Sequence, residues 1–339
     1  MSLPRIAALS DIAKIADRLP EGDTTAAEAA RARQNSLTKP PGSLGRLEAL
    51  AEFMATWRGT ARPEIWRAQA LVFAGNHGIC AQGVNPYPQE VTAQMVANFE
   101  NGGAAINQLC AVNGADLSVI ALELDRPTGD FTEGPAMSET DCLDALWQGA
   151  SAVDEGADIL ILGEMGIGNS TVAAALAAAC FGGDVAEWTG PGTGSDKAGI
   201  ARKIDAIGRG LKRHEGVIGN APVILAALGG REQAAICGAV LAARAARIPV
   251  ILDGFICTAA AAVLYATDKR LLDHCLVGHA SAEPGHRKLL AAIHKRPVLE
   301  FDMRLGEGSG AALALGIVRS ALACHNGMAT FGEAGVSEA

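Results

Sequence analysis

The sequence predicts an α/β fold in which a parallel, Rossmann-like sheet is flanked by helices, with a small helical lobe formed by the N- and C-terminal segments. Short runs rich in Val, Ile and Leu alternate with longer Ala-rich segments along the chain. These runs lack the polar alternation of strands with one face in water. The 339 residues, 49% of them apolar, suffice for one large core with a small appendage.

Two helices are expected before the first strand, over 24–33 and 44–57. Ser43 is a candidate N-cap for the second, whose apolar face comprises Leu44, Leu47, Leu50, Ala51 and Met54. Each of the six expected strands is near-continuously apolar, so both of its faces should be buried. The strands are expected at 70–74, 117–122, 158–162, 249–253, 274–277 and 298–301.

A last helix is expected over 309–323, where it could pack on the first two helices. We therefore expect an N-terminal helical segment over 1–60, a main α/β domain over 61–305, and a C-terminal helix over 306–339 that returns to the helical lobe. No linker rich in Pro, Gly or Ser separates these parts, and no internal repeat is found.

Composition and charge indicate which classes of binding partner and which cellular location to expect. A formal net charge of -9 argues against nucleic acid as a partner. The first residues include Asp11, Lys14, Asp17 and Arg18 and no apolar core of a signal peptide, so secretion is not expected, and the uncharged stretch 165–183 is better explained as a buried loop and helix than as a membrane insertion. Eight scattered cysteines without a CxxC pair are typical of a reduced, cytoplasmic protein.

The richest candidate site follows the expected strand 158–162. Residues 163–171 read Gly-Glu-Met-Gly-Ile-Gly-Asn-Ser-Thr and lead into a helix, so backbone amides and hydroxyls would face a phosphate at a positive helix end. The alternative is a glycine turn that only packs tightly. A second glycine-rich segment, 189–196, is followed by Lys203, which could contribute a positive charge to the same phosphate. The spacing is neither that of a dinucleotide fold nor that of a P-loop.

Glu307 stands between two glycines, after the last expected strand and before the last expected helix. A carboxylate gains nothing from packing there and is costly if buried without a partner. Partial burial would raise its pKa toward neutrality, as a general base requires. The alternative is a carboxylate that is exposed or only caps the helix. Three histidines, His274, His279 and His286, lie close in sequence but on different expected elements, so no metal site is predicted.

Six segments in order along the chain resemble the successive signature segments of the nicotinate-nucleotide dimethylbenzimidazole phosphoribosyltransferase family. They are Leu37–Glu48, Gly75–Gly78, Gly83 with Pro88–Thr92, Gly163–Asn169, Ile248–Phe255 and Met303–Ala311. The resemblance implies transfer of the phosphoribosyl group of nicotinate mononucleotide to 5,6-dimethylbenzimidazole, which gives α-ribazole 5'-phosphate and nicotinate for the nucleotide loop of cobalamin. It also implies a homodimer that uses no cofactor and no bound metal.

Matched to the family's motifs, Glu307 would be the catalytic base that removes the benzimidazole N–H proton. Residues expected to hold the nucleotide are Glu164, Gly166, Asn169, Ser170, Gly192, Lys203 and Ser281. Residues expected near the benzimidazole ring are Tyr87, Met95 and Leu305. Because the pyridinium nitrogen of the donor is already cationic, nicotinate can leave without an acid, and displacement with inversion would turn a β donor into an α product.

Two other functional classes are considered. A dinucleotide-dependent oxidoreductase would share the fold class, but the GxGxxG fingerprint is missing from the sequence. A protein that only binds a benzimidazole or a corrinoid would share the pocket, but a buried carboxylate at Glu307 would not favour the binding of a neutral aromatic base.

Overall fold

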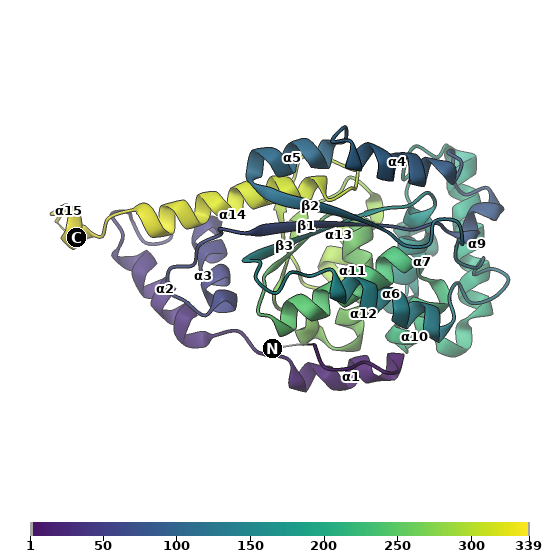
Figure 1. Cartoon of the computed structure of the whole chain (residues 1–339), viewed down its shortest axis with the longest axis horizontal. Coiled ribbons are helices and arrows are strands. Elements are labelled where there is room, and N and C mark those ends of the chain that lie inside the picture. The colour runs from purple at the N-terminus through teal and green to yellow at the C-terminus, as the bar shows by residue number, and fades with distance from the viewer. Residues whose placement is uncertain (1–2, 338–339) are drawn as a thin grey trace.

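The computed structural model describes residues 3–337 and has a sheet of six parallel strands at its centre (Figure 1). The strand order is β2-β1-β3-β4-β5-β6. The α/β class predicted from the sequence is confirmed, and each expected strand is present, shifted by at most a few residues. The strands are β1 (Ala68–Ala74), β2 (Ala115–Ala121), β3 (Ile159–Met165), β4 (Val250–Leu252), β5 (Cys275–His279) and β6 (Pro297–Leu299).

The expectation that every strand is buried on both faces is wrong for the two edge strands. The four inner strands are almost wholly buried, whereas β2 alternates between half-buried and exposed residues, and β6 is half-buried throughout. An edge strand has a neighbour on one side only, so helices cover it less completely. The last strand also ends earlier than expected, because Phe301 has left the sheet and is 64% exposed.

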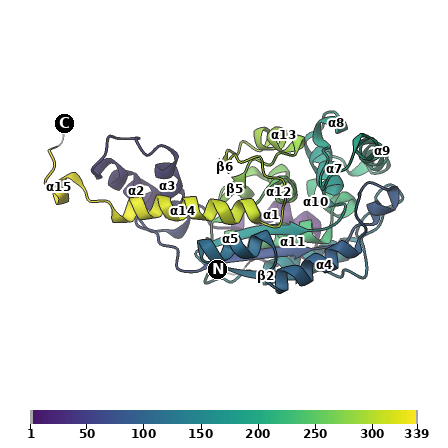
Figure 2. The same ribbon diagram turned by 90° about the horizontal axis from the view of Figure 1, so that it is seen from above.

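Successive residues of each inner strand contribute to different cores, as the pleat requires. Leu71 and Phe73 of β1 belong to a core shared with the helices of one face, among them α6, α7, α10, α11 and α12. Ala70 and Val72 belong to a second core shared with α3, α5 and α14 on the other face. Figures 1 and 2 show these two helical layers with the sheet between them. This arrangement exposes the carboxyl ends of the strands at one edge.

The helices alternate with the strands along the chain. Their bounds are α1 (Ile12–Ile15), α2 (Thr24–Ser36), α3 (Arg46–Arg58), α4 (Glu90–Glu100), α5 (Ala105–Asn113), α6 (Glu139–Ser151), α7 (Asn169–Phe181), α8 (Val185–Trp188), α9 (Lys197–Arg213), α10 (Ala221–Leu228), α11 (Arg231–Ala245), α12 (Phe255–Thr267), α13 (Pro284–Ala292), α14 (Ser309–Gly327) and α15 (Phe331–Ala334).

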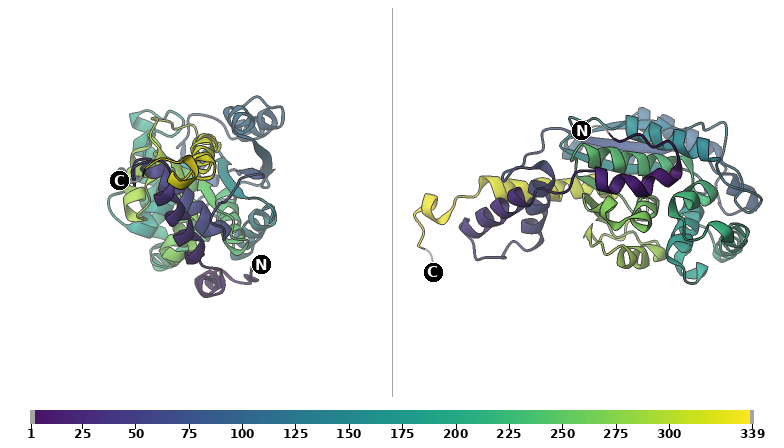
Figure 3. Two further views of the ribbon diagram at one scale, coloured as in Figure 1. Left: turned by 90° about the vertical axis from the view of Figure 1, so that its left-hand side faces the viewer. Right: turned by 90° about the horizontal axis from the view of Figure 1, so that it is seen from below.

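Helices α2 and α3 lie beside the C-terminal half of α14, which extends beyond the sheet (Figures 1 and 3). A buried hydrogen bond joins α2 to α14, in which Gln34 Nε2 lies 2.8 Å from His325 Nδ1. Residues before α2 take a different course, and Ile12 and Ile15 of α1 pack into the core of the main body. The domain boundaries at residues 60 and 305 stay predictions.

Ser43 is not the N-cap of α3, contrary to the sequence prediction. The helix begins at Arg46, after Gly45 with φ of 54°, and no side chain caps it at that position. Glu48 in the first turn instead accepts the Leu44 amide at 3.0 Å and the Lys39 ammonium at 2.7 Å. The Glu48 carboxylate, and not the Ser43 hydroxyl, therefore accepts a backbone amide at the start of α3. It also neutralises the buried Lys39.

The uncharged stretch 165–183 contains the end of β3 and all of α7, as predicted. Residues 171–179 of this helix are buried, and Ala side chains allow it to pack closely in the core next to α12. Among residues 3–337, no helix combines the length and the apolar character needed to cross a membrane. All eight cysteines are free thiols.

Helices α6 and α11 cross at unusually short range because each presents a glycine to the other. A Cβ on Gly149 would lie 1.9 Å from the Ala235 carbonyl oxygen, and a Cβ on Gly238 would lie 1.8 Å from the Leu146 carbonyl oxygen. Neither backbone oxygen can rotate away, so any side chain at these positions must push the two helices apart.

We therefore expect Gly238→Ala to lower the free energy of unfolding by about 1–3 kcal/mol or more, through overpacking. Gly208→Ala is the matched control, because Gly208 lies on α9 with open space around the position of a Cβ. That substitution should raise helix propensity and stabilise the protein by about 0.5–1 kcal/mol. Chemical denaturation of both variants measures the two effects, and equal stabilities would contradict the close crossing.

Candidate active site

The carboxyl ends of β3, β4 and β5 open into one cavity, where a parallel sheet is expected to bind its ligand. Glu164 and Met165 end β3, Asp253 follows β4 and His279 ends β5, and all four line the cavity. Its empty volume is about 740 Å³, including the part that opens to solvent. This is within the usual size of a small-molecule site.

Most of the residues selected from the sequence line this cavity. They are Glu164, Gly166, Asn169, Ser170, Gly192, Lys203, Ser281 and Leu305. The glycine loop before α7 therefore does face the cavity, although it also packs tightly: a Cβ on Gly166 would lie 2.6 Å from the Gly75 carbonyl oxygen. The first residues of α7, Asn169 and Ser170, line the same space, and the positive end of a helix suits an anion.

Three of the selected residues, Tyr87, Met95 and Glu307, are not among those that line the cavity. Tyr87 is half-exposed and follows Asn85 and Pro86, which do line it. Met95 lies on α4, half-buried against the second core. Glu307 directly follows Gly306, a lining residue.

The Glu307 carboxylate is held by an unusual backbone. Three consecutive residues have positive φ: 86° at Gly306, 66° at Glu307 and 89° at Gly308. This conformation is strained for a glutamate, and such strain persists only where the surroundings enforce it. Glu307 is only 6% exposed, and its Oε2 atom has no hydrogen-bond partner among the described residues. Burial, and secondarily the charge of Asp253, raises the pKa of this carboxyl group.

Asp253 enforces the backbone around Glu307. Its Oδ2 accepts the Gly308 amide at 3.1 Å and its Oδ1 accepts the Ala311 amide at 2.9 Å. The first turn of α14, which has no cap from its own sequence neighbours, is thus capped by the carboxylate that follows β4. On the other side, Gly163 lets the loop approach β3, since a Cβ there would lie 2.5 Å from the Glu307 carbonyl oxygen.

Two further acidic side chains and two imidazoles surround this pair. Glu164 is buried and accepts a hydrogen bond from Asn169 Nδ2, and burial, with Asp253 and Glu232 nearby, raises its pKa well above the usual range. His279 Nε2 lies 3.7 Å from Asp253 Oδ1. Behind the cavity wall, His77 Nε2 lies 3.1 Å from Glu232 Oε1, with both side chains almost fully buried. Several acidic side chains thus gather near the ends of the strands, and burial makes Glu164 and Glu307 bind a proton more readily than an exposed glutamate does.

Two cationic side chains, Lys203 and Arg304, also line the cavity. Lys203 of α9 is 3% exposed and donates to Ser170 Oγ at 3.2 Å and to the Gly190 carbonyl oxygen at 3.1 Å. Burial lowers the pKa of its ammonium group, and Glu283 opposes that effect. Arg304 donates to the Gly192 carbonyl oxygen at 2.9 Å. Lysine, hydroxyl and helix N-terminus together suit a phosphate.

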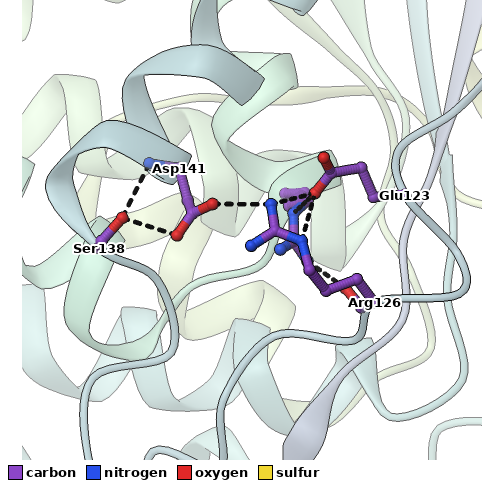
Figure 4. Close-up of polar contacts among 5 residues, drawn as sticks. Glu123, Arg126, Ser138 and Asp141 are labelled. Atoms are coloured by element: carbon purple, nitrogen blue, oxygen red, sulfur yellow. Dashed lines mark hydrogen bonds and ion pairs between the residues drawn. The ribbon is translucent and has the colours of Figure 1, made fainter.

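The start of α11, and with it the Glu232 carboxylate, is fixed by a network outside the cavity (Figure 4). Arg231 Nε lies 3.1 Å from Glu123 Oε2, and Arg231 also donates to the Arg126 carbonyl oxygen at 2.7 Å. Arg126 in turn lies 2.8 Å from Asp141 Oδ1 at the start of α6. The loop after β2 is thereby tied to α6 and α11.

Sequence reasoning assigned no role to four ionisable residues of the cavity: Asp253, His279, Glu283 and Arg304. Asp253 was expected only as the last residue of a strand, and His279 only as one of three histidines that form no metal site. Their position at the ends of strands was a usable signal, because the ends of parallel strands meet at one edge. Arg304 lies in the segment Met303–Ala311, whose resemblance to a family motif was also a signal, whereas no local pattern indicates Glu283.

We expect Asp253→Asn to loosen the first turn of α14, because an amide nitrogen would replace one of two acceptor oxygens. Hydrogen exchange at the Gly308 and Ala311 amides should accelerate by about tenfold or more, corresponding to about 1.5–3 kcal/mol for a hydrogen bond to a charged group. Asp196→Asn is the control, since Asp196 caps α9 through the Gly199 amide and asparagine caps equally well. Unchanged protection at both α14 amides would contradict the role of Asp253.

The chain was compared with known proteins. A family model described as phosphoribosyltransferase matches residues 19–336. The nicotinate-nucleotide–dimethylbenzimidazole phosphoribosyltransferase of Rhodobacter capsulatus is 67% identical over 328 residues, 97% of this chain and 98% of the relative. The enzyme of the same name from Novosphingobium aromaticivorans is 56% identical over 336 residues, 99% of each chain. A crystal structure of the enzyme of that name from Thermus thermophilus has a TM-score of 0.87 at 40% identity and covers 94% of this chain and 100% of its own.

Proposed function

The chain belongs to the nicotinate-nucleotide–dimethylbenzimidazole phosphoribosyltransferase family, and we propose that it transfers the phosphoribosyl group of nicotinate mononucleotide to 5,6-dimethylbenzimidazole. The products are α-ribazole 5'-phosphate and nicotinate, and the reaction serves assembly of the lower nucleotide loop of cobalamin. The observation that supports this proposal best is the Glu307 carboxylate, which is buried directly after the cavity-lining Gly306 and has one oxygen without a hydrogen-bond partner among the described residues, while Lys203 and Arg304 line the same cavity.

Glu307 acts as the general base in this proposal. Its raised pKa gives a carboxylate basic enough to take the N–H proton of the benzimidazole as the second ring nitrogen attacks C1' of the ribose. The C1'–N bond to the pyridinium breaks at the same time, and its electron pair stays on nicotinate, which leaves as a neutral pyridine ring. Attack from the face opposite the leaving group inverts C1'.

In this proposal, Lys203 and its neighbours hold the phosphate, and the glutamates lie beside the base and the ribose. Lys203, Ser170 and Ser281 offer an ammonium group and two hydroxyls for the phosphate. Burial raises the pKa of Glu164, so this carboxyl group can hold a proton and donate it in a hydrogen bond to a ribose oxygen, while Asn169 orients it. Leu305 in the lining and Tyr87, which follows two lining residues, are exposed and offer apolar surface to the flat benzimidazole ring, and Met95 stays a predicted neighbour of that ring.

Glu307→Gln should lower kcat by about 10²–10⁴-fold, because an amide of the same shape cannot accept the proton. The wild type should lose activity as the pH falls through the pKa of Glu307, since only the deprotonated form is a base. That pKa lies above the ordinary value for glutamate, so the loss occurs at a higher pH than for an exposed glutamate. Chromatography of nicotinate and α-ribazole 5'-phosphate across a pH series measures both effects.

Glu300→Gln is the matched control, since Glu300 is an exposed carboxylate a few residues before Glu307 and its removal should leave the pH profile unchanged. A wild-type protein that forms no product at saturating substrates would overturn the transferase and favour a protein that only binds the base. A fully active Glu307→Gln variant would leave the reaction standing and remove Glu307 as its base.

A further inference from the structure

The turn at Gly190–Gly192 folds around a carboxylate from another part of the chain. Glu283, which precedes α13, is 6% exposed, and its Oε1 accepts the Gly192 amide at 2.9 Å. A Cβ on Gly190 would lie 2.1 Å from Glu283 Oε2. The glycines therefore leave room for this one side chain, and the Gly192 amide, which the sequence suggested for the nucleotide, is already engaged.

The ionisable groups near Glu283 come from three elements. Lys203 on α9 and Arg304 in the loop before α14 attract the carboxylate, while burial raises its pKa. His286 on α13 stays neutral, because burial lowers the pKa of its imidazole to about 3. The carboxylate thus accepts a backbone amide and is attracted by two cations, in a cavity that Ser170 and Ser281 also line.

A phosphate is recognised by the same groups that recognise a carboxylate: an ammonium or guanidinium group, hydroxyls and backbone amides. Within the proposed function, we propose that Glu283 occupies the place of the substrate phosphate in the unliganded protein and that its negative charge weakens the binding of nicotinate mononucleotide. Binding then requires that the carboxylate leave the Gly192 amide or take up a proton. Glu283 is thereby an affinity-determining residue that keeps the Gly190–Gly192 turn ordered when no nucleotide is bound.

Glu283→Gln tests this directly, because the amide oxygen can still accept the Gly192 amide while the charge is lost. By calorimetry at pH 8, the variant should bind nicotinate mononucleotide on the order of tenfold more tightly than the wild type, as expected for removing one like charge near a phosphate. Nicotinate riboside, which lacks the phosphate, should bind both proteins equally. The measured quantity, in each protein, is the affinity for nicotinate mononucleotide divided by the affinity for nicotinate riboside. This ratio should be larger in the variant.

A role of Glu283 in holding the turn alone would leave that ratio unchanged, and an unchanged or smaller ratio overturns the proposal. Glu283→Ala gives the same ratio test if the glutamine variant does not fold, since disorder of the turn would affect both ligands while the charge affects only the phosphate. The proposed function is checked separately by product formation in the wild type. If the wild type forms product but its variants gain no preference for the nucleotide, only the role of Glu283 is refuted. If the wild type binds no nucleotide and forms no product, the role of Glu283 and the proposed function are both refuted.

Discussion

The capping of α14 by Asp253 is the contact on which the geometry of the candidate site depends. One carboxylate at the end of β4 accepts amides from Gly308 and Ala311, and so joins the sheet to the helix that follows Glu307. The three positive φ angles around Glu307 would otherwise relax, because a glutamate in that conformation is strained. Asp253 also raises the pKa of Glu307 by its negative charge. Burial is the larger cause of that raised pKa, so Asp253 fixes the position of the proposed base and adds to its basicity.

The cavity brings charges of both signs together. Glu164, Asp253 and Glu283 line it with Lys203 and Arg304, His279 lies beside Asp253, and Glu307 follows the lining residue Gly306. Burial raises the pKa values of Glu164 and Glu307, so these carboxyl groups hold protons more tightly than exposed ones. A ligand with an anionic phosphate and a ring that gives up a proton is complementary to this set of charges.

Close packing of glycine against backbone makes the site possible. Gly163 lets the Glu307 loop lie on β3, and Gly149 and Gly238 let α6 and α11 cross at short range on the opposite face of the sheet. The ion pairs around Arg126 and Arg231 then fix the start of α11, where Glu232 meets His77 behind the cavity wall. The cavity is therefore supported by two layers of helices rather than by its loops alone.

The sequence alone determined the fold class, the six strands and the segments that carry the site, because apolar runs and glycine-rich strand ends are local patterns. It also indicated Glu307, whose placement between two glycines has no use in packing. Tertiary structure decided what depends on contacts between distant segments. Such contacts are the capping of α14 by Asp253 and the hydrogen bond from the Gly192 amide to Glu283. It also decided that Glu48 and not Ser43 accepts an amide at the start of α3, and that β2 and β6 are partly exposed. No sequence window contains both partners of a contact such as Asp253 to Ala311, so its geometry follows only once the sheet is assembled.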